Sequence, residues 1–181
     1  PVTVTSINNT PTGVIKANLT AGSAYGIYGN GGSIGTLINA GLISGIGGST
    51  GIGIKLISNN IETITNSGTI TASAVEDTAY GIFLDRSSSV GTITNSGTIT
   101  TSADDNTAYG IYLDDNSTVG TITNSGTITT SADDSEAIGI FVDTNSSVGT
   151  ITNSGTITAS AGEDAVGSNV VDSPSAGATT K

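Results

Sequence analysis

The chain repeats itself at an interval of 29 residues. The segment GTITNSGTIT occurs at residues 91–100, 120–129 and 149–158, and a copy with one changed residue begins at Glu62. A weaker copy, GTLINAGLIS, occupies residues 35–44, and an eroded one at residues 7–16 keeps Asn9, Gly13 and Ile15. A period of about 20 to 50 residues is typical of a solenoid, a propeller or a repeat array. We therefore expect six copies of one structural unit.

The apolar pattern within the unit predicts strands. Single isoleucines stand between threonines in each TIT triplet, and a third apolar segment follows, such as AYGIFLD from Ala79 or AYGIYLD from Ala108. No segment has the i, i+3, i+4 spacing of an amphipathic helix, whereas alternation is the mark of a strand. The predicted fold class is all-β: a parallel β-helix, or β-solenoid, of about six three-sided coils of roughly 27 to 30 residues.

One solenoid domain is expected over residues 1–172, with coils that begin near residues 4, 34, 61, 90, 119 and 148. Residues 173–181 are interpreted as a polar C-terminal tail. Strict alternation of side chains predicts that the isoleucine of each TIT triplet points inward on the first and second sides, and that Tyr80, Ile82 and Leu84 and their copies do so on the third side. A narrow apolar core is expected along the axis.

Composition excludes several classes of function. The chain has 4 basic and 15 acidic residues, a net charge of −11, and no histidine, cysteine, methionine or tryptophan. A negative surface repels nucleic acid, and the missing side chains are the usual imidazole bases, thiol nucleophiles and transition-metal ligands. No apolar run approaches the ~20 residues of a membrane-spanning helix. We expect neither an enzyme nor a nucleic-acid-binding protein.

The phrase ITNSGTIT followed by YGI in each turn resembles the repeats of passenger domains of bacterial autotransporters and related exported adhesins. The resemblance covers roughly residues 4–172. It implies a right-handed parallel β-helix, a location outside the cell or on its surface, and an adhesive or structural role without catalytic residues. Because the sequence begins at Pro1 rather than at methionine, we expect a processed protein or a piece of a longer exported one.

Stacked coils place each residue about 4.8 Å from its copy, so that like side chains form ladders. A structural ladder of amides is expected at the Asn-Ser-Gly turn, from Asn39, Asn66, Asn95, Asn124 and Asn153. An exposed row of aromatic residues is expected on the third side, from Tyr28, Phe83, Tyr112 and Phe141, interrupted by Lys55. Such a row either contacts a protein or a sugar or stabilises neighbouring strands.

Carboxylates form two further ladders. One turn carries Asp85, Asp114, Asp143 and Asp172, and one loop carries Glu76/Asp77, Asp104/Asp105, Asp133/Asp134 and Glu163/Asp164. Stacked like charges repel, and bound calcium is one form of relief, although the glycine-rich calcium-binding nonapeptide is absent. The possible calcium ligands are Asp85, Asp114, Asp143, Asp104, Asp105, Asp133 and Asp134. A catalytic pair for glycosidic bonds is disfavoured, because these acids recur in every coil.

The expected function is that of an extracellular structural protein. Solenoid ends expose strand edges, so subunits are expected to stack head to tail as part of a cell-surface filament or adhesin stalk. Outward Val14, Ile38 and Leu42 add an apolar patch that is typical of a partner contact, with a surface glycan or protein as a further candidate partner. An alternative is ice binding by the Thr-x-Thr faces, such as Thr63/Thr65 and Thr69/Thr71. A polysaccharide-binding or polysaccharide-cleaving β-helix ranks lower.

Overall fold

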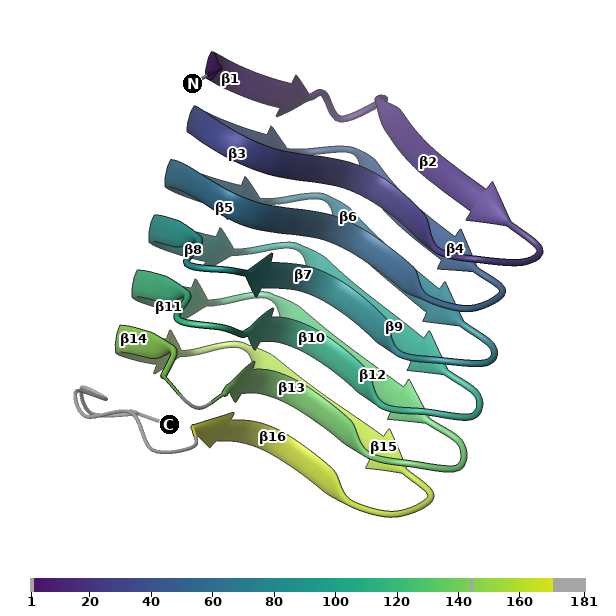
Figure 1. Ribbon diagram of the computed structural model, residues 1–181. Helices are drawn as coiled ribbons and strands as arrows, with labels where there is room; N and C mark the ends of the chain where they lie inside the picture. The colour runs from purple at the N-terminus through teal and green to yellow at the C-terminus, as the bar shows by residue number, and fades with distance from the viewer. Residues whose placement is uncertain (1, 144, 171–181) are drawn as a thin grey trace.

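The computed structural model describes residues 2–143 and 145–170, and every regular element of this part of the chain is a β-strand. The chain winds through three sides in each coil (Figure 1). The first side contains β1 (Thr3–Asn9), the second halves of β3 (Ala24–Asn39) and β5 (Gly51–Asn66), then β8 (Ser89–Asn95), β11 (Thr118–Asn124) and β14 (Ser147–Asn153).

The second side contains β2 (Val14–Leu19), β4 (Leu42–Gly47), β6 (Thr69–Ala74), β9 (Thr98–Ala103), β12 (Thr127–Ala132) and β15 (Thr156–Ala161). The third side contains the first halves of β3 and β5, then β7 (Ala79–Asp85), β10 (Ala108–Leu113), β13 (Ala137–Val142) and β16 (Ala165–Val170). Each side thus has one strand per coil, because the three segments of the repeat recur in the same order.

The strands of successive coils pair in parallel and in register with the sequence repeat. Val4 pairs with Ile34, Ile34 with Ile61, Ile61 with Val90, Val90 with Val119, and Val119 with Val148. The predicted fold class is therefore confirmed: the chain is an all-β parallel β-solenoid of about six coils.

Two of the three sides share one hydrogen-bonded sheet. The second side forms a separate 6-stranded sheet, whereas the first and third sides belong to a single 10-stranded sheet. In β3 and β5 the third side continues directly into the first. From β7 onward a turn separates them, in which Arg86 and Ser87 have φ angles of 51° and 61°. This left-handed turn recurs in the next coil at Asp115 and Asn116.

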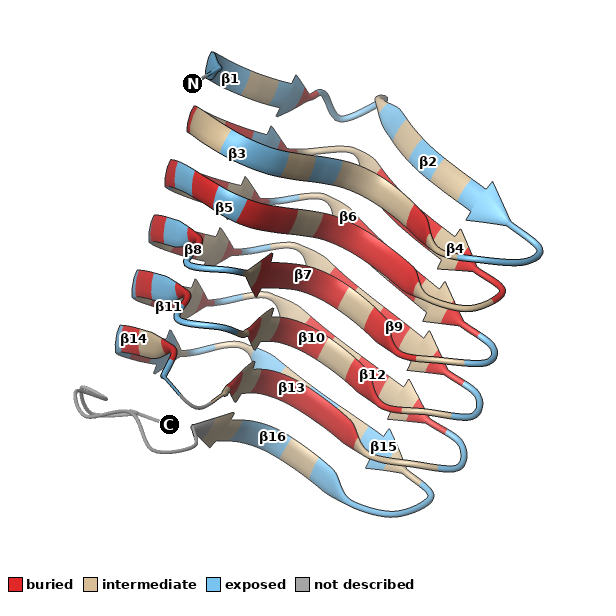
Figure 2. Ribbon diagram, viewed as in Figure 1, coloured by how far each residue is buried: buried red, intermediate tan, exposed pale blue. Residues whose placement is uncertain are grey.

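The core is a stack of aliphatic side chains along the axis. Buried residues, red in Figure 2, recur on the strands of the middle coils. Ile64, Ile93 and Ile122 on the first side are each 1% exposed, and Ile70, Ile99 and Ile128 on the second side are fully buried. A second, smaller cluster consists of alanines such as Ala74, Ala103 and Ala132. Alanine is suited to the corner where the second and third sides approach each other. The alternating TIT pattern therefore places its isoleucines as expected.

Glycine is required in the Asn-Ser-Gly turn because the turns lie directly on one another. A Cβ atom on Gly97 would lie 2.1 Å from the carbonyl oxygen of Gly68, and one on Gly126 would lie 2.1 Å from that of Gly97. The backbone N–H groups of Ser96 and Gly97 both donate to the carbonyl oxygen of Asn66. The turn therefore repeats the same bonds from coil to coil.

Residues 171–181 lie outside the described part of the chain, and the expected tail at residues 173–181 and the expected acid Asp172 fall within them. Among the described residues there is no helix that could cross a membrane.

Candidate functional site

The five asparagines of the Asn-Ser-Gly turn form a continuous chain of amide hydrogen bonds. Each Nδ2 donates to the Oδ1 of the asparagine in the next coil, at 2.7 Å from Asn39 to Asn66, from Asn66 to Asn95 and from Asn95 to Asn124, and at 2.8 Å from Asn124 to Asn153. Asn9 adds a sixth member through a 2.7 Å bond to Asn39. Asn39, Asn66, Asn95 and Asn124 are at most 1% exposed, so these are interior bonds.

The asparagine ladder has a direction. Each Nδ2 points toward the C-terminal end, where it also donates to a backbone carbonyl of the next coil, at 3.0 Å from Asn39 to Thr69 and 3.2 Å from Asn95 to Thr127. Every Oδ1 points toward the N-terminal end. Because all amides are oriented alike, the two ends of the ladder offer different groups.

An aromatic strip runs along the outer face of the third side. It consists of Tyr80, Phe83, Tyr109, Tyr112 and Phe141. Within a coil the ring centroids are 4.5 Å apart for Tyr80 and Phe83 and 4.7 Å apart for Tyr109 and Tyr112. Between coils they are 5.4 Å apart for Tyr80 and Tyr109, with an interplanar angle of 11°. The rings of Tyr80, Phe83, Tyr109 and Tyr112 are therefore stacked within and between coils, whereas the Phe141 ring is tilted by 35° against Tyr112.

The prediction that Tyr80 and its copy Tyr109 point inward is wrong. Strict alternation fails at Gly81: a Cβ atom there would lie 2.5 Å from Cγ2 of the core residue Ile99, and the next residue, Ile82, is also fully buried. Two consecutive inward positions leave Tyr80 and Phe83 on the same outer face, three residues apart. The glycine between them was the signal that the alternation is interrupted.

The prediction of an exposed aromatic row is also wrong for Phe83, which is only 7% exposed because its neighbours cover its ring. Tyr112 and Phe141 are half-buried, and Tyr28, at 52%, is the most exposed of the four. Lys55 does not merely interrupt the row, since its Nζ lies 4.5 Å from the centroid of the Phe83 ring. The ring faces cover one another, so the strip offers mainly ring edges to a ligand.

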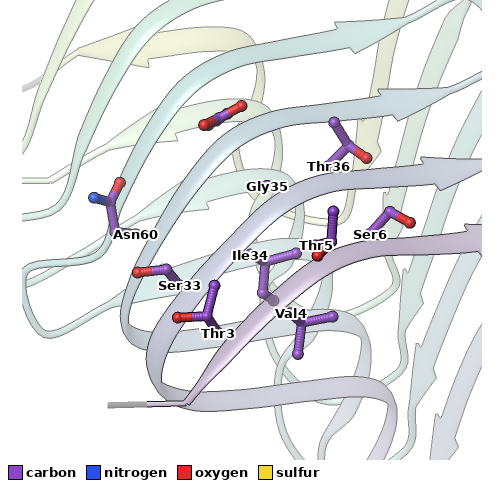
Figure 3. A pocket seen from close by; sticks show the side chains of 10 residues that line it. Thr3, Val4, Thr5, Ser6, Ser33, Ile34, Gly35, Thr36 and Asn60 are labelled. Carbon is purple, nitrogen blue, oxygen red and sulfur yellow. The ribbon is translucent and has the colours of Figure 1, made fainter.

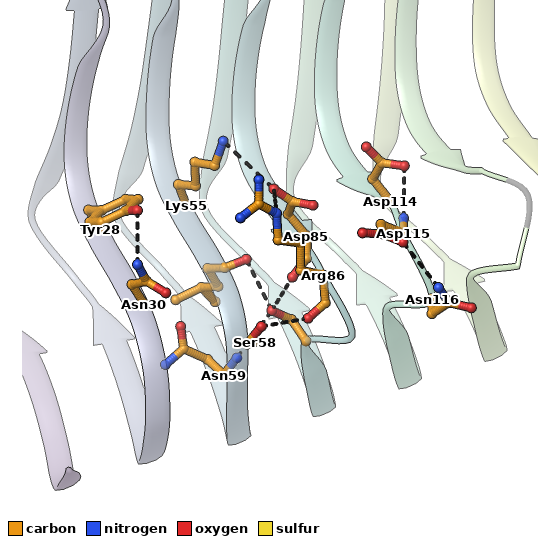
Figure 4. A network of polar contacts seen from close by, with 12 residues as sticks. Tyr28, Asn30, Lys55, Ser58, Asn59, Asp85, Arg86, Asp114, Asp115 and Asn116 are labelled. Atoms are coloured by element: carbon orange, nitrogen blue, oxygen red, sulfur yellow. Dashed lines mark hydrogen bonds and ion pairs between the residues drawn. The ribbon is translucent and has the colours of Figure 1, made fainter. Parts of the chain in front are cut away.

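Carboxylates stand where the strands of the aromatic strip end: Asp85 is the last residue of β7, and Asp114 follows β10 directly. Figure 4 shows both residues. Asp85 lies 3.9 Å from Nζ of Lys55 and 4.0 Å from Nε of Arg86. The Tyr112 hydroxyl donates to Asp143 at 3.1 Å. Asp85 and Asp143 therefore interact with different partners, Asp85 with two cations and Asp143 with a tyrosine hydroxyl.

Burial raises the pKa of several side chains in and beside the aromatic strip. It raises the pKa of Tyr80 from 10.0 to about 12. Burial, together with the carboxylates of Asp114 and Asp143, raises the pKa of Tyr112 above its ordinary value. Burial also raises the pKa of the Asp114 carboxyl, helped by Asp143 and Asp85 and opposed by the backbone hydrogen bond from Asp115. The tyrosines therefore stay neutral hydroxyls at physiological pH.

The possible calcium ligands lie in two separate columns. Asp85, Asp114 and Asp143 follow one another from coil to coil at the aromatic strip, whereas Asp104, Asp105, Asp133 and Asp134 are exposed in the loops before β10 and β13. Residues 2–143 and 145–170 contain no group of three or more acidic side chains that could hold a metal ion. The geometry therefore gives no support to the calcium prediction.

The Thr-x-Thr faces form regular columns. On the second side Thr69, Thr98, Thr127 and Thr156 are in register, and so are Thr71, Thr100, Thr129 and Thr158. The inward isoleucines between them leave these threonines on the outer face, as predicted. The columns end at β4 and β2, where Leu42 and Val14 occupy the first threonine position.

A pocket of about 530 Å³ lies near the N-terminal end, between β1, β3 and β5 (Figure 3). Its polar lining consists of threonine and serine hydroxyls from β1 and β3, Asn60 and one carboxylate, Glu62. Most glycoside hydrolases use a pair of carboxylates, and this lining contains one, Glu62.

The chain matches no protein-family model, no curated protein and no solved structure in comparisons with known proteins. The fold and its ladders define the class of protein instead. The chain is a parallel β-solenoid repeat protein in which amide, aromatic and threonine columns follow the axis.

Proposed function

We propose that this protein is an extracellular structural rod whose subunits stack along the solenoid axis into a filament or an adhesin-like stalk. The observation that carries the proposal is that successive coils are joined by the same interactions along the whole axis. Parallel strands in register and one asparagine bond recur from coil to coil, and among the described residues β1, β2, β14 and β15 each pair on one edge only. A further copy can continue both sheets with bonds of the same kind.

Composition and chemistry agree with this role. The described acids have local partners or face solvent, and the lining of the N-terminal pocket has a single carboxylate. The resemblance of the ITNSGTIT repeats to autotransporter passenger domains and exported adhesins supports a place on the cell surface. Surface glycans and proteins are secondary candidate partners, for which Tyr28 and the outward Val14 and Ile38 offer exposed apolar area.

Electron microscopy and light scattering test the assembly. We expect filaments one solenoid wide, whose mean length increases with protein concentration, because stacking adds subunits to open ends. A variant with Thr100→Lys is the control: it places a charge on the outer face of β9 and leaves both ends unchanged, so it should still form filaments. Monodisperse short particles at every concentration would contradict the proposal.

Ice binding is the second candidate function. The observation in its favour is the two threonine columns of the second side, which keep register over β6, β9, β12 and β15. A regular array of hydroxyl and methyl groups on a rigid sheet is suited to a crystalline surface, whereas threonine is also a common residue of exposed strands.

Thermal hysteresis separates the two functions. If the second side binds ice, the wild-type protein lowers the freezing point below the melting point and shapes ice crystals, and Thr100→Lys abolishes both effects because a lysine disrupts the array. Hysteresis that is absent from the wild type, or unchanged in the variant, rejects ice binding by this face.

A further inference from the structure

The two ends of the asparagine ladder are complementary. Inside the rod, Asn124 Nδ2 donates to Asn153 Oδ1 at 2.8 Å and to the Thr156 carbonyl at 3.3 Å. At the C-terminal end, Asn153 Nδ2 has one described acceptor, the Gly155 carbonyl of its own turn at 3.4 Å. At the N-terminal end, no described residue donates to Asn9 Oδ1. One end thus offers an amide donor and the other an amide acceptor.

The charge is also distributed unequally along the axis. Residues 1–61 contain Lys16 and Lys55 and no acidic residue, so they carry +2 of the net charge of −11, and residues 62–181 carry −13. Lys16 lies exposed on β2, the outermost strand of its sheet, whereas Glu163 and Asp164 lie exposed in the last loop before β16. The C-terminal end is therefore acidic. The N-terminal strands β1 and β2 carry Lys16 and no acidic residue, whereas Lys55 lies further along the axis on β5 and is paired with Asp85.

The isoleucine column of the second side is uncovered at both ends. Ile43, Ile70, Ile99 and Ile128 are fully buried, but the terminal members Ile15 and Ile157 are only partly buried. The register of the sheet places them in one continuous column. Each end therefore has apolar surface that one more coil would cover.

We propose that copies of this chain stack in a single orientation, with the C-terminal end of one copy on the N-terminal end of the next. The inference rests on the proposed function and assigns its contact: Asn153 Nδ2 donates to Asn9 Oδ1 of the following copy, and Ile157 covers Ile15. The partner of each end is a second copy of this chain.

Contact between like ends is disfavoured by the same amide and charged groups. Contact between two C-terminal ends sets amide donor against donor and the acidic loops against each other, and contact between two N-terminal ends sets acceptor against acceptor. Both also make the strands at the junction antiparallel, which breaks the register of the ladders. Like-charge contacts of this kind select orientation more than they add affinity.

A matched pair of end-blocking variants tests the orientation. Ile15→Lys and Ile157→Lys each place an inward-pointing lysine on an outermost strand, one at each end. The long side chain reaches solvent while the end is open, but a covering coil would bury its charge without a partner, which is strongly unfavourable. Stacking is therefore blocked at one end of each variant.

The readout is sedimentation velocity at a concentration where the wild type forms filaments. We expect each variant alone to be monomeric, and an equal mixture to form a dimer of twice that mass through the two unblocked ends. If one variant alone dimerises, like ends meet and the orientation is refuted, while the proposed filament stands. A mixture that stays monomeric, although both variants keep the circular dichroism of the wild type, also refutes it. A monomeric wild type overturns the proposed function and this inference together.

Asn153→Asp tests the assigned contact at a position where the substitution costs the fold less than it does inside the ladder. The new carboxylate still accepts a hydrogen bond from Asn124 Nδ2. It has no N–H group to donate to the next copy, and its second oxygen would repel Oδ1 of Asn9 in that copy. We expect the concentration needed for assembly to rise about tenfold or more. An unchanged assembly concentration refutes the contact between Asn153 and Asn9, and this result is obtained even if either lysine variant fails to fold.

Discussion

Replacing Gly110 by alanine is expected to destabilise the solenoid by about 3 kcal/mol, at the upper end of the usual cost of overpacking. The added Cβ would lie 2.4 Å from the carbonyl oxygen of Gly139 and 2.5 Å from Cγ2 of Ile128. The first atom belongs to the backbone of the next coil and the second to a fully buried side chain, so neither moves without displacing a strand. The midpoint of urea unfolding measures the loss.

Gly167 provides the matched control. It occupies the same column as Gly110 and Gly139 in the last described coil, but a Cβ atom on it would have Ile157 Cγ2, at 4.0 Å, as its nearest neighbour. Gly167→Ala should therefore leave the urea midpoint nearly unchanged. Equal losses in the two variants would show that backbone flexibility, and not the close approach of stacked coils, explains the glycine column.

Asn95→Asp is expected to cost about 4 kcal/mol at pH 7. The side chain is 1% exposed; its Oδ1 accepts from Asn66 and its Nδ2 donates to Asn124. An aspartate keeps the acceptor but sets a second oxygen against Asn124 Oδ1, so folding requires the carboxyl to be protonated. Holding a carboxyl with an ordinary pKa of about 3.9 in its neutral form at pH 7 costs about 4 kcal/mol.

The cost should depend on pH in a defined direction. The pKa of this carboxyl would be raised in the folded state, so the fold of the variant is favoured below about pH 4 and loses stability as the pH rises. Urea unfolding of variant and wild type at pH 3 and pH 7 measures the difference, which should fall to about 1 kcal/mol at pH 3. The protonated carboxyl can then donate to Asn124.

Asn153→Asp is again the informative control, because this asparagine has no ladder neighbour beyond it among the described residues. Its Oδ1 accepts from Asn124 and its Nδ2 reaches only Gly155. Under conditions that keep the protein monomeric, the substitution should cost well under half as much as Asn95→Asp. A similar cost at both positions would contradict the directed ladder, since direction is what makes the interior position sensitive.

Much of the fold followed from the repeat. A 29-residue period with TIT triplets led to a parallel solenoid, to coil starts that lie in register, and to inward isoleucines such as Ile93 and Ile122. These predictions succeed because stacking identical units makes the sequence period and the spatial period the same. The asparagine positions followed for the same reason, since a residue that repeats in sequence lies beside its copy in space.

The aromatic strip was predicted only in part. Tyr80 and Tyr109 were expected in the core because alternation was continued through Gly81 and Gly110, yet both glycines face inward together with the isoleucine that follows. The low exposure of Phe83 depends on Tyr112 and Lys55 of the two neighbouring coils as well as on Tyr80 of its own repeat. The uneven charge of the two halves, in contrast, could have been found in the sequence by counting charges along the chain.

By itself, the sequence determined the class of fold. A short repeat with single isoleucines and glycine-containing turns can bury those isoleucines only if successive coils stack on one another. The sequence also determined which residues form columns. Only the tertiary structure decided that two sides share one sheet, that Tyr80 lies outside, and that every amide of the asparagine ladder points the same way. These features depend on the direction of strands and side chains across the coil junctions, and a repeat pattern specifies position along the axis but not direction.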